Sequence, residues 1–275
     1  RDPYFMDKNL LFGVTGYKST REYQGEYKRR SVGAEIMLGK ELAEYWGVTA
    51  TYNFDVTRIY DVSWYAMQSV KDEEGDWTTS AVTLAITHDS RDNIKDPLKG
   101  ARHQYSISLA GLGGNVGFVK HYLDSGVYLP IFDESTFHVR GRIGWLSSTF
   151  GKRVPIYQKF YVGGLDTIRG LDYGYAGPKD PQTGEAIGAD KMFIGNAEYI
   201  FPIMEELKLK GIVFYDIGKG WANGESIGSG LRHTAGGGFR WFSPFGPIRV
   251  EYGFNLDKKP GESSGRIEFG SGTNF

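Results

Sequence analysis

Length, composition and charge exclude several classes of protein. The chain has 275 residues with 32 basic and 33 acidic side chains, so no excess of positive charge points to a nucleic-acid partner. It has no cysteine, which excludes a disulfide framework and thiolate metal sites. No apolar run reaches about 18 residues, so we expect no transmembrane helix. The 39 glycines, 18 tyrosines and 17 phenylalanines fit either a soluble all-β domain or an outer-membrane barrel.

Alternating apolar and polar residues predict twelve strands along the chain. In chain order the alternating segments are 10–17, 32–39, 48–57, 82–89, 104–109, 119–129, 137–145, 193–201, 208–217, 234–241, 248–252 and 266–275. One face of the segments is apolar and includes Leu84 and Val213. The opposite face carries the charged residues Glu35, Asp55, Asp124, Arg140, Arg142, Glu198, Asp216, Arg240, Arg249 and Glu251. This pattern favours a sheet with lipid on one side and a polar lumen on the other.

The connections between these segments alternate in length. Those after the first, third, seventh, ninth and eleventh segments are mostly long, beginning with a polar loop over 21–30. Those after the second, fourth, sixth, eighth and tenth are mostly tight and rich in proline or glycine. Long loops at one end and short turns at the other are typical of outer-membrane barrels. Because an open edge in lipid would leave backbone groups unsatisfied, we expect a closed antiparallel up-and-down barrel of about twelve strands. Residues 1–275 are expected to form this single transmembrane β-barrel domain, with both termini at the short-turn end.

One connection, 151–191, is far longer than a hairpin needs, and it contains Arg169 among glycines and aromatic residues. Two readings are open on pattern alone. The loop is an ordinary surface loop with a solvated arginine, or it folds inward. In the second case the buried guanidinium requires carboxylate partners, because an unpaired buried charge is costly. Glu198 and Asp216, on the charged face of the two following strands, are placed to supply them.

Several motifs become specific when they are taken together. They are 160–171 with Ile168, Arg169, Gly170 and Leu171, then 88–100, 214–218 and 241–247, and the last strand with Ile267, Phe269, Gly270, Gly272 and Phe275. Over nearly its whole length the chain resembles the BamA family, the central barrel subunits of the outer-membrane barrel-assembly machinery. The resemblance implies that the loop 151–191 folds into the lumen and that Glu198 and Asp216 match the family's partners of Arg169. It also implies that the last strand is a terminal assembly signal.

The chain departs from the family pattern at its beginning. The resemblance implies a barrel of sixteen strands preceded by periplasmic POTRA domains. No POTRA segment is found here, and 2–5 resembles the turn that ends the family's fourth strand, so we expect four strands to be missing. Ile168 and Leu171 replace the commoner valine and phenylalanine of the loop motif, which keeps its flanks apolar.

The resemblance implies an assembly factor that inserts and folds β-barrel proteins into the bacterial outer membrane without ATP or a cofactor. Its implied partners are the lipid bilayer, nascent outer-membrane proteins, and periplasmic lipoprotein subunits that bind through POTRA domains. The family mechanism relies on a weak seam between the first and last strands, and Gly270 and Gly272 weaken the pairing of the last strand here. Because the missing strands would change the first partner of that seam, the isolated chain need not retain the activity.

Two other functions stay open, and no enzyme is indicated. The chain could be a two-partner-secretion-type translocation pore or passive channel of the same superfamily, or a stable barrel fragment without activity. His88 beside Asp89 lies at a strand-to-turn junction, with no nucleophile placed near it. The five histidines have no metal-ligand spacing, and the acidic run 72–76 lacks the calcium-loop pattern. The glycine-rich segment 111–117 joins two strands, so it forms no dinucleotide site. We therefore expect no metal and no cofactor.

Overall fold

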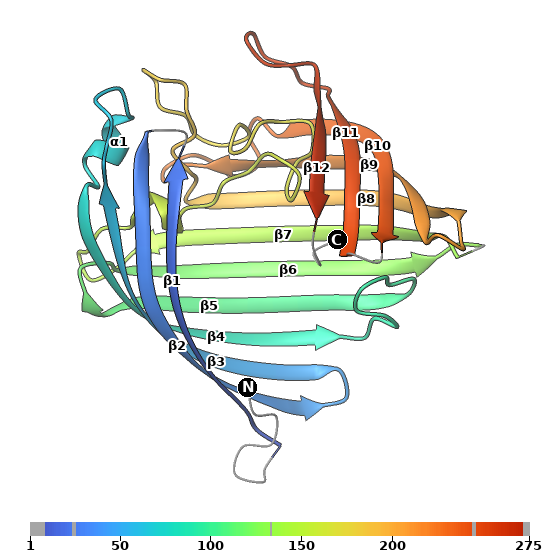
Figure 1. The fold of residues 1–275 in the computed structure, drawn as a ribbon, viewed down its shortest axis with the longest axis horizontal. Helices are drawn as coiled ribbons and strands as arrows, with labels where there is room; N and C mark the ends of the chain where they lie inside the picture. The colour runs from blue at the N-terminus through green and yellow to red at the C-terminus, as the bar shows by residue number, and fades with distance from the viewer. Residues whose placement is uncertain (1–8, 24–25, 133, 244–245, 272–275) are drawn as a thin grey trace.

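The computed structural model is a single curved sheet, and it describes residues 9–23, 26–132, 134–243 and 246–271 (Figure 1). Its strands are β1 (Leu11–Tyr23), β2 (Tyr27–Ala43), β3 (Trp46–Tyr60), β4 (Gly75–Asp89), β5 (Gly100–Gly114), β6 (Phe118–Pro130), β7 (Thr136–Ser148), β8 (Lys191–Met204), β9 (Leu209–Trp221), β10 (Arg232–Ser243), β11 (Gly246–Asn255) and β12 (Gly265–Ser271). Two short helical turns, α1 (Gln68–Lys71) and η2 (Ile156–Gln158), lie in the longer connections. No helix within the described residues is long and apolar enough to cross a membrane.

Each strand pairs antiparallel with the next one along the chain, so the order in the sheet is the order in the sequence. The register is continuous over most pairs, and β3 with β4 pairs without interruption from Trp46 opposite His88 to Ile59 opposite Gly75. The prediction of an all-β, up-and-down antiparallel fold of twelve strands is therefore confirmed. Local alternation was sufficient to find it, because each strand is paired only with its sequence neighbours.

The two faces of the sheet differ as alternation predicted. Side chains on the convex face are apolar and exposed, with Leu84 at 53% and Val213 at 51%. On the opposite face Asp216 is completely buried and Glu251 is 1% exposed, although both are charged. Successive side chains of a strand point to opposite sides, which separates these two environments over a few ångströms. Exposed apolar residues on the convex face are the arrangement that a surrounding bilayer stabilises.

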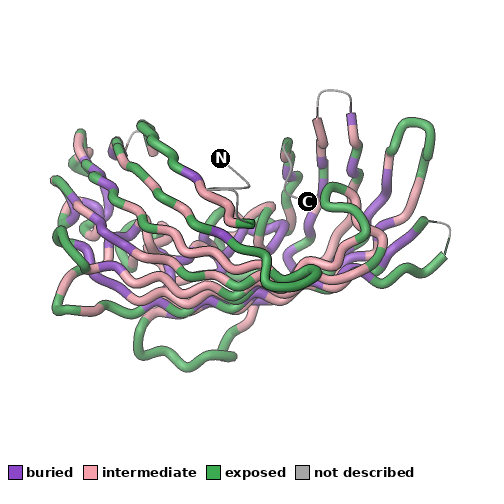
Figure 2. Tube along the Cα trace, turned by 90° about the horizontal axis from the view of Figure 1, so that it is seen from below, coloured by how far each residue is buried: buried purple, intermediate pink, exposed green. Residues whose placement is uncertain are grey.

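The expectation of a closed twelve-strand barrel was wrong. No pairing joins the described residues of β1 to those of β12, and the sheet is an open trough whose two edges lie apart (Figures 1 and 2). Pairing between neighbours is local, whereas closure depends on strand number, tilt and stagger acting together. Twelve strands with this gentle curvature trace part of a wider barrel. The need to satisfy edge amides in lipid did not by itself predict how many strands complete the circle.

The asymmetry of the connections is present with one correction. The predicted long loop over 21–30 is mostly strand, because β1 extends to Tyr23 and β2 begins at Tyr27. The rings of these two tyrosines stack at a centroid distance of 4.5 Å, which joins the strand ends. The charged residues of this stretch therefore belong to strands. The first described strand begins and the last one ends at the short-turn end, as expected.

Two substitutions test the assignment of the convex face to lipid. Leu84→Arg and Val213→Arg should each lower the free energy of unfolding in vesicles by about 2–4 kcal/mol at mid-membrane depth, because a charge must enter hydrocarbon. The measurement is equilibrium denaturation of the reconstituted chain. Glu206→Arg, in the exposed β8–β9 turn, is the control and should be neutral. Neutral results at both strand positions would reverse the assignment of the two faces.

Candidate functional site

The connection between β7 and β8 lies on the inner face of the trough and is fixed there by its own backbone (Figure 1). Phe160 and Ala189 exchange two backbone hydrogen bonds of 2.9 and 2.7 Å, which closes the base of the loop. The amide of Ala176 donates to Val162, and Gly220 of β9 donates to Ala176, both over 2.8 Å. Val162 and Ala189 are completely buried. The loop is therefore a packed element of the fold, joined directly to the wall of the sheet.

Arg169 is the most extensively bonded side chain of this loop. Its Nε and Nη2 donate to the two carboxylate oxygens of Asp216 on β9, over 2.8 and 2.6 Å. Its Nη1 lies 2.7 Å from Glu198 Oε1 on β8 and donates to Glu251 Oε2 on β11 over 3.0 Å. The backbone amide of Arg169 also donates to Asp216 over 3.0 Å. One planar guanidinium thus contacts three carboxylates on three strands, a geometry that lysine could not reproduce.

The carboxylates are bonded in turn to other groups of the wall. Arg240 on β10 donates to Glu198 and to Glu251, each over 3.0 Å. His138 Nδ1 lies 3.1 Å from the second oxygen of Glu198, and Asn196 donates to Asp216 over 2.7 Å. Two guanidinium groups therefore share three carboxylates. Burial of so many charges is tolerable only because each one has ionic and hydrogen-bonded partners.

Apolar groups cover part of this cluster, which on another side borders a polar cavity of about 760 Å³. The Cζ atom of Arg169 lies 3.6 Å from the centroid of the Phe214 ring, close enough for a cation–π contact. Ile168 is completely buried and Leu171 is 3% exposed on either side of the arginine. Arg169 itself is 3% exposed. Exclusion of water strengthens each electrostatic contact and raises the cost of leaving any partner unpaired.

Gly170 allows the loop to touch the wall backbone to backbone. Its φ of +86° lies in the left-handed region that favours glycine. A Cβ atom on Gly170 would lie 2.6 Å from the carbonyl of Gly253 on β11, and a Cβ on Gly253 would lie 2.6 Å from the amide nitrogen of Gly170. The Gly170 amide donates to Glu268 Oε1 on β12 over 3.1 Å. The two glycines permit a contact that any larger residue would prevent.

The structure brings together the residues singled out in the sequence and adds others. Ile168, Arg169, Gly170 and Leu171 lie against the wall, and Arg169 contacts both Glu198 and Asp216. The sequence-based prediction placed Glu251 on the inner face but missed it as a third partner of Arg169. It placed Glu268 on the polar face of the last strand but did not predict its contact with Gly170. Inward acidic residues at strand positions were a visible signal, but the pattern does not say which of them reach one loop residue.

The last strand is placed at the free edge of the sheet. Ile267 and Phe269 are 68% and 66% exposed on its outer side. Gly270 faces inward, and a Cβ there would lie 2.6 Å from Leu165 Cδ2 and 2.9 Å from Arg249 Nε, so a larger residue would have to displace these two side chains. Gly272 and Phe275 lie outside the described residues. The role of this strand as an assembly signal remains a prediction.

A second contact fixes the loop near its beginning. Glu73, in the β3–β4 connection, accepts the backbone amide of Ile156 with both oxygens, over 2.9 and 3.1 Å. Burial raises the pKa of the Glu73 carboxyl to about 7, although the Ile156 amide and Arg153 oppose the shift. Because the folded pKa is above the ordinary value, the folded state holds a proton that the unfolded chain has lost between about pH 4.5 and 7. The contribution of Glu73 to the free energy of unfolding is therefore largest at the acidic end and falls as pH rises.

The histidine and acidic motifs that suggested chemistry have structural roles. His88 and Asp89 end β4, where Asp89 accepts hydrogen bonds of 2.8 and 2.7 Å from Arg91. His88 packs on the Trp46 ring at a centroid distance of 4.8 Å. Among the residues that the structure describes, no group of three or more His, Cys, Asp or Glu side chains is arranged to hold a metal ion.

The contact between the two glycines leads to a specific expectation. Gly253→Ala and Gly170→Ala should displace the segment 163–171 from the wall and make it sensitive to protease in the folded barrel, because the added methyl would overlap backbone atoms. Gly141→Ala on β7 is the control for Gly253, since no atom lies within 4 Å of its Cβ position. Gly224→Ala is the control for Gly170, with φ of +93° and open space. Equal sensitivity of variants and controls would contradict a tight contact.

The Glu73 contact should respond to pH in a defined direction. Between pH 5 and 7.5 the free energy of the opening that exposes Glu73 together with the Ile156 amide, from hydrogen exchange corrected for intrinsic rates, should fall as Glu73 loses its proton. Glu73→Gln, which stays neutral, should remove this dependence. Glu74→Gln, an exposed neighbour, is the control and should keep it. A wild-type opening free energy that rises with pH would contradict the assignment.

Comparison with known proteins gives the family of the chain. A family model described as the Omp85 superfamily domain matches residues 1–275. The outer membrane protein assembly factor BamA of Nitratidesulfovibrio vulgaris is 32% identical over 280 aligned residues, covering 100% of this chain and 35% of that protein. The crystal structure of BamA from Haemophilus ducreyi lacking POTRA domains 1–3 matches with a TM-score of 0.83 at 20% identity, covering 98% of this chain and 59% of that one. CdiB from Acinetobacter baumannii matches with a TM-score of 0.60 at 13% identity, covering 94% of this chain and 46% of that one.

These likenesses agree with the geometry of the sheet. The two structural matches show the fold alone, and their lower coverage of the matched chains agrees with a sheet that traces part of a wider barrel. The chain spans between 35% and 40% of the length of three BamA relatives. An outer-membrane location of the relatives and an exposed apolar convex face place the chain in the outer membrane as an integral protein. The chain belongs to the Omp85 superfamily.

Proposed function

We propose that this chain is the barrel part of an outer-membrane protein assembly factor, which inserts and folds β-barrel proteins into the outer membrane. The observation that carries the proposal is the 32% identity, along the whole chain, to a relative that is named as such a factor. Two further relatives with that name match 92% and 100% of the chain. The substrates are then nascent outer-membrane proteins, and the surrounding medium is the lipid bilayer.

The placement of the β7–β8 loop supports an assembly factor over a wide passive channel. The segment 160–171 is packed against the inner wall, and Arg169 is bonded to β8, β9 and β11. A loop held against the inner wall by buried charges would narrow the lumen and oppose free diffusion through it. The likeness to CdiB fits the alternative of a translocation pore, and it has the lower TM-score of the two structural matches.

In this proposal Ile168, Arg169, Gly170 and Leu171 form a lock that keeps the loop inside the barrel and stiffens one wall. Three of the four strands β8 to β11 contribute a carboxylate to Arg169, and the fourth contributes Arg240. A rigid wall of this kind would let rearrangement concentrate elsewhere, at the free edges of β1 and β12. Loss of one partner from a dry pair costs about 3–5 kcal/mol, enough to release the loop.

The proposed activity needs no catalytic group, because strand insertion makes and breaks no covalent bond. The relatives are named as assembly factors, and we infer that this chain is likewise not an enzyme. Favourable transfer of apolar strand faces into lipid supplies the free energy. Periplasmic lipoprotein subunits, implied by the resemblance to bind through POTRA domains, remain a predicted class of partner.

The test is an insertion assay with the whole protein that carries this chain, reconstituted in vesicles. It should accelerate folding of an urea-unfolded outer-membrane barrel, measured as the heat-modifiable folded fraction over time. No acceleration, together with large steady currents in planar bilayers, would contradict an assembly factor and favour a pore.

Variants in the same assay test the lock separately. Arg169→Ala should abolish most of the acceleration and lower barrel heat stability, and Arg169→Lys should restore little, because one ammonium cannot contact three carboxylates in this geometry. Arg58→Ala removes an exposed ion pair of 3.7 Å with Asp76 and is the control, expected to be neutral. If Arg169→Ala behaved like the wild type, the proposed lock would be wrong, but the proposed insertion activity would not be contradicted.

A further inference from the structure

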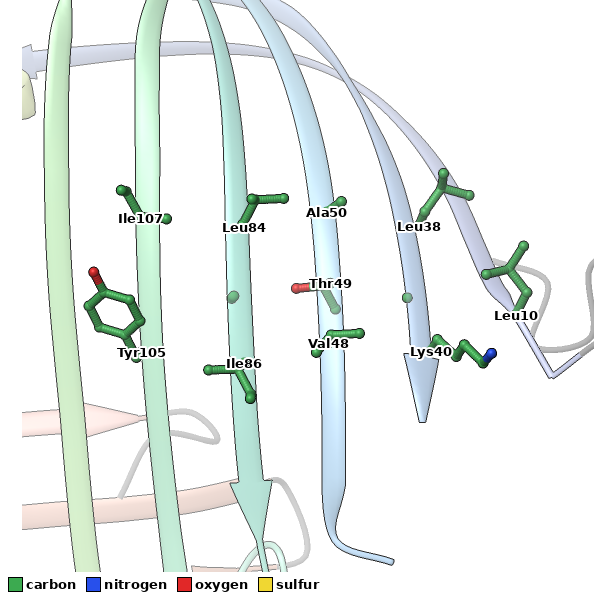
Figure 3. A pocket seen from close by; sticks show the side chains of 12 residues that line it. Leu10, Leu38, Lys40, Val48, Thr49, Ala50, Leu84, Ile86, Tyr105 and Ile107 are labelled. Atoms are coloured by element: carbon green, nitrogen blue, oxygen red, sulfur yellow. The ribbon is translucent and has the colours of Figure 1, made fainter. Parts of the chain in front are cut away.

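A furrow crosses the convex, lipid-facing side of the sheet along β3. Its floor is Ala50 and Val48, and the register places Leu38 beside Ala50 on β2 and Leu84 beside it on β4. Figure 3 shows Leu10 and Leu38 on one side and Leu84, Ile86, Tyr105 and Ile107 on the other. A small residue between larger neighbours makes the depression, which has a volume of about 440 Å³. This volume is within the range of small-molecule sites, roughly 300–1,000 Å³.

Along β3 the furrow is lined from Val48 to Ala50. Trp46 and Tyr52 lie on the same outer side, one row beyond this lining at either end and six residues apart. At about 3.3 Å per residue this is roughly 20 Å. One leaflet contributes about 15 Å of the roughly 30 Å hydrocarbon core. A single extended acyl chain lying parallel to β3 therefore fits between the two rings.

One end of the furrow is cationic. Lys40 lies next to Leu38 on the same outer face, one row nearer the arrowhead of β2, and it pairs in register with Val48 (Figure 3). Lys40 is exposed and makes no ion pair with any residue in the described part of the chain. Trp46 and His88 lie one row beyond it, with rings 4.8 Å apart. Tryptophan at this level is typical of the membrane interface, where lipid phosphates lie.

We propose that the furrow is a binding site for one anionic phospholipid of the periplasmic leaflet. Its acyl chain lies over Ala50 and Val48, and its phosphate pairs with the Lys40 ammonium. The short turns, near which Lys40 lies, are periplasmic in barrels of this class, which selects the leaflet. The net negative charge of the headgroup complements a lysine that makes no ion pair within the described residues. The inference depends on the outer-membrane location and is independent of the insertion activity.

The site would give the barrel a lipid contact on β2 to β5, away from the Arg169 cluster on β8 to β11. A chain seated between Leu38 and Leu84 would add apolar contacts across three adjacent strands. Bound lipid would thereby stiffen β2 to β5 from their outer side, away from the contacts of Arg169. The chemistry that recognises it is an apolar chain of leaflet length attached to a phosphate.

Native mass spectrometry of the full chain in detergent, with dioleoyl phosphatidylglycerol as probe, tests the site. We expect one tightly retained lipid per chain. Lys40→Gln should weaken phosphatidylglycerol binding about fivefold, the effect of losing about 1 kcal/mol at one lysine. Ala50→Phe should fill the furrow and weaken binding at least as much, for phosphatidylglycerol and phosphatidylcholine alike.

Ala197→Phe is the matched control for bulk on the outer face. Ala197 lies on β8 between Val139 and Tyr215, far along the sheet from the furrow, and its replacement should leave binding unchanged. A loss in Ala197→Phe equal to that in Ala50→Phe would show non-specific lipid association and overturn the proposal. So would wild-type retention in Ala50→Phe. If Lys40→Gln weakened the binding of phosphatidylglycerol and of phosphatidylcholine equally, the proposed role of the anionic headgroup would be wrong.

Discussion

The structure depends on one buried ionic contact, between Arg169 of the long loop and the carboxylates of Glu198, Asp216 and Glu251. A charged group so far from water is stable only when all its donors are used, and here the fork of the guanidinium is matched by three strands. The surrounding groups support these contacts between the guanidinium and the carboxylates. Arg240 and Asn196 occupy carboxylate oxygens, Phe214 covers the guanidinium face, and paired glycines let the backbones touch. The loop and the wall are consequently one unit.

The bilayer imposes the opposite arrangement on the convex face. Apolar residues there are exposed without penalty because the surrounding medium is hydrocarbon, and polar groups are confined to the inner face and the loops. The same alternation therefore builds a buried ionic cluster inside and a lipid-contacting surface outside. The cationic end of the furrow at Lys40 is the place where the outer pattern changes from apolar to polar, as expected at the depth of phosphate groups.

Much of this fold could be predicted from sequence because its information is local. Twelve strands, their faces and the uneven connections followed from alternation and turn residues. Contact of Arg169 with Glu198 and Asp216 was expected from the family motif and from inward acids on the next two strands. Glu251, 82 residues further along, was not expected, because strand alternation fixes a face and not a distance across the lumen. The prediction of a closed barrel was wrong for a related reason, since curvature is a property of the whole sheet.

Distances between two spin labels would test most directly whether Arg169 holds the loop inside the barrel. The chain has no cysteine, so labels can be placed at Tyr173, which is exposed beside the motif, and at Glu206 in the β8–β9 turn. The account predicts one narrow distance distribution in the otherwise wild-type chain in vesicles. It predicts a broad and shifted distribution after Arg169→Ala, in molecules that still migrate as folded barrel. The same narrow distribution in both would contradict it, because the loop would then be held in place without the arginine.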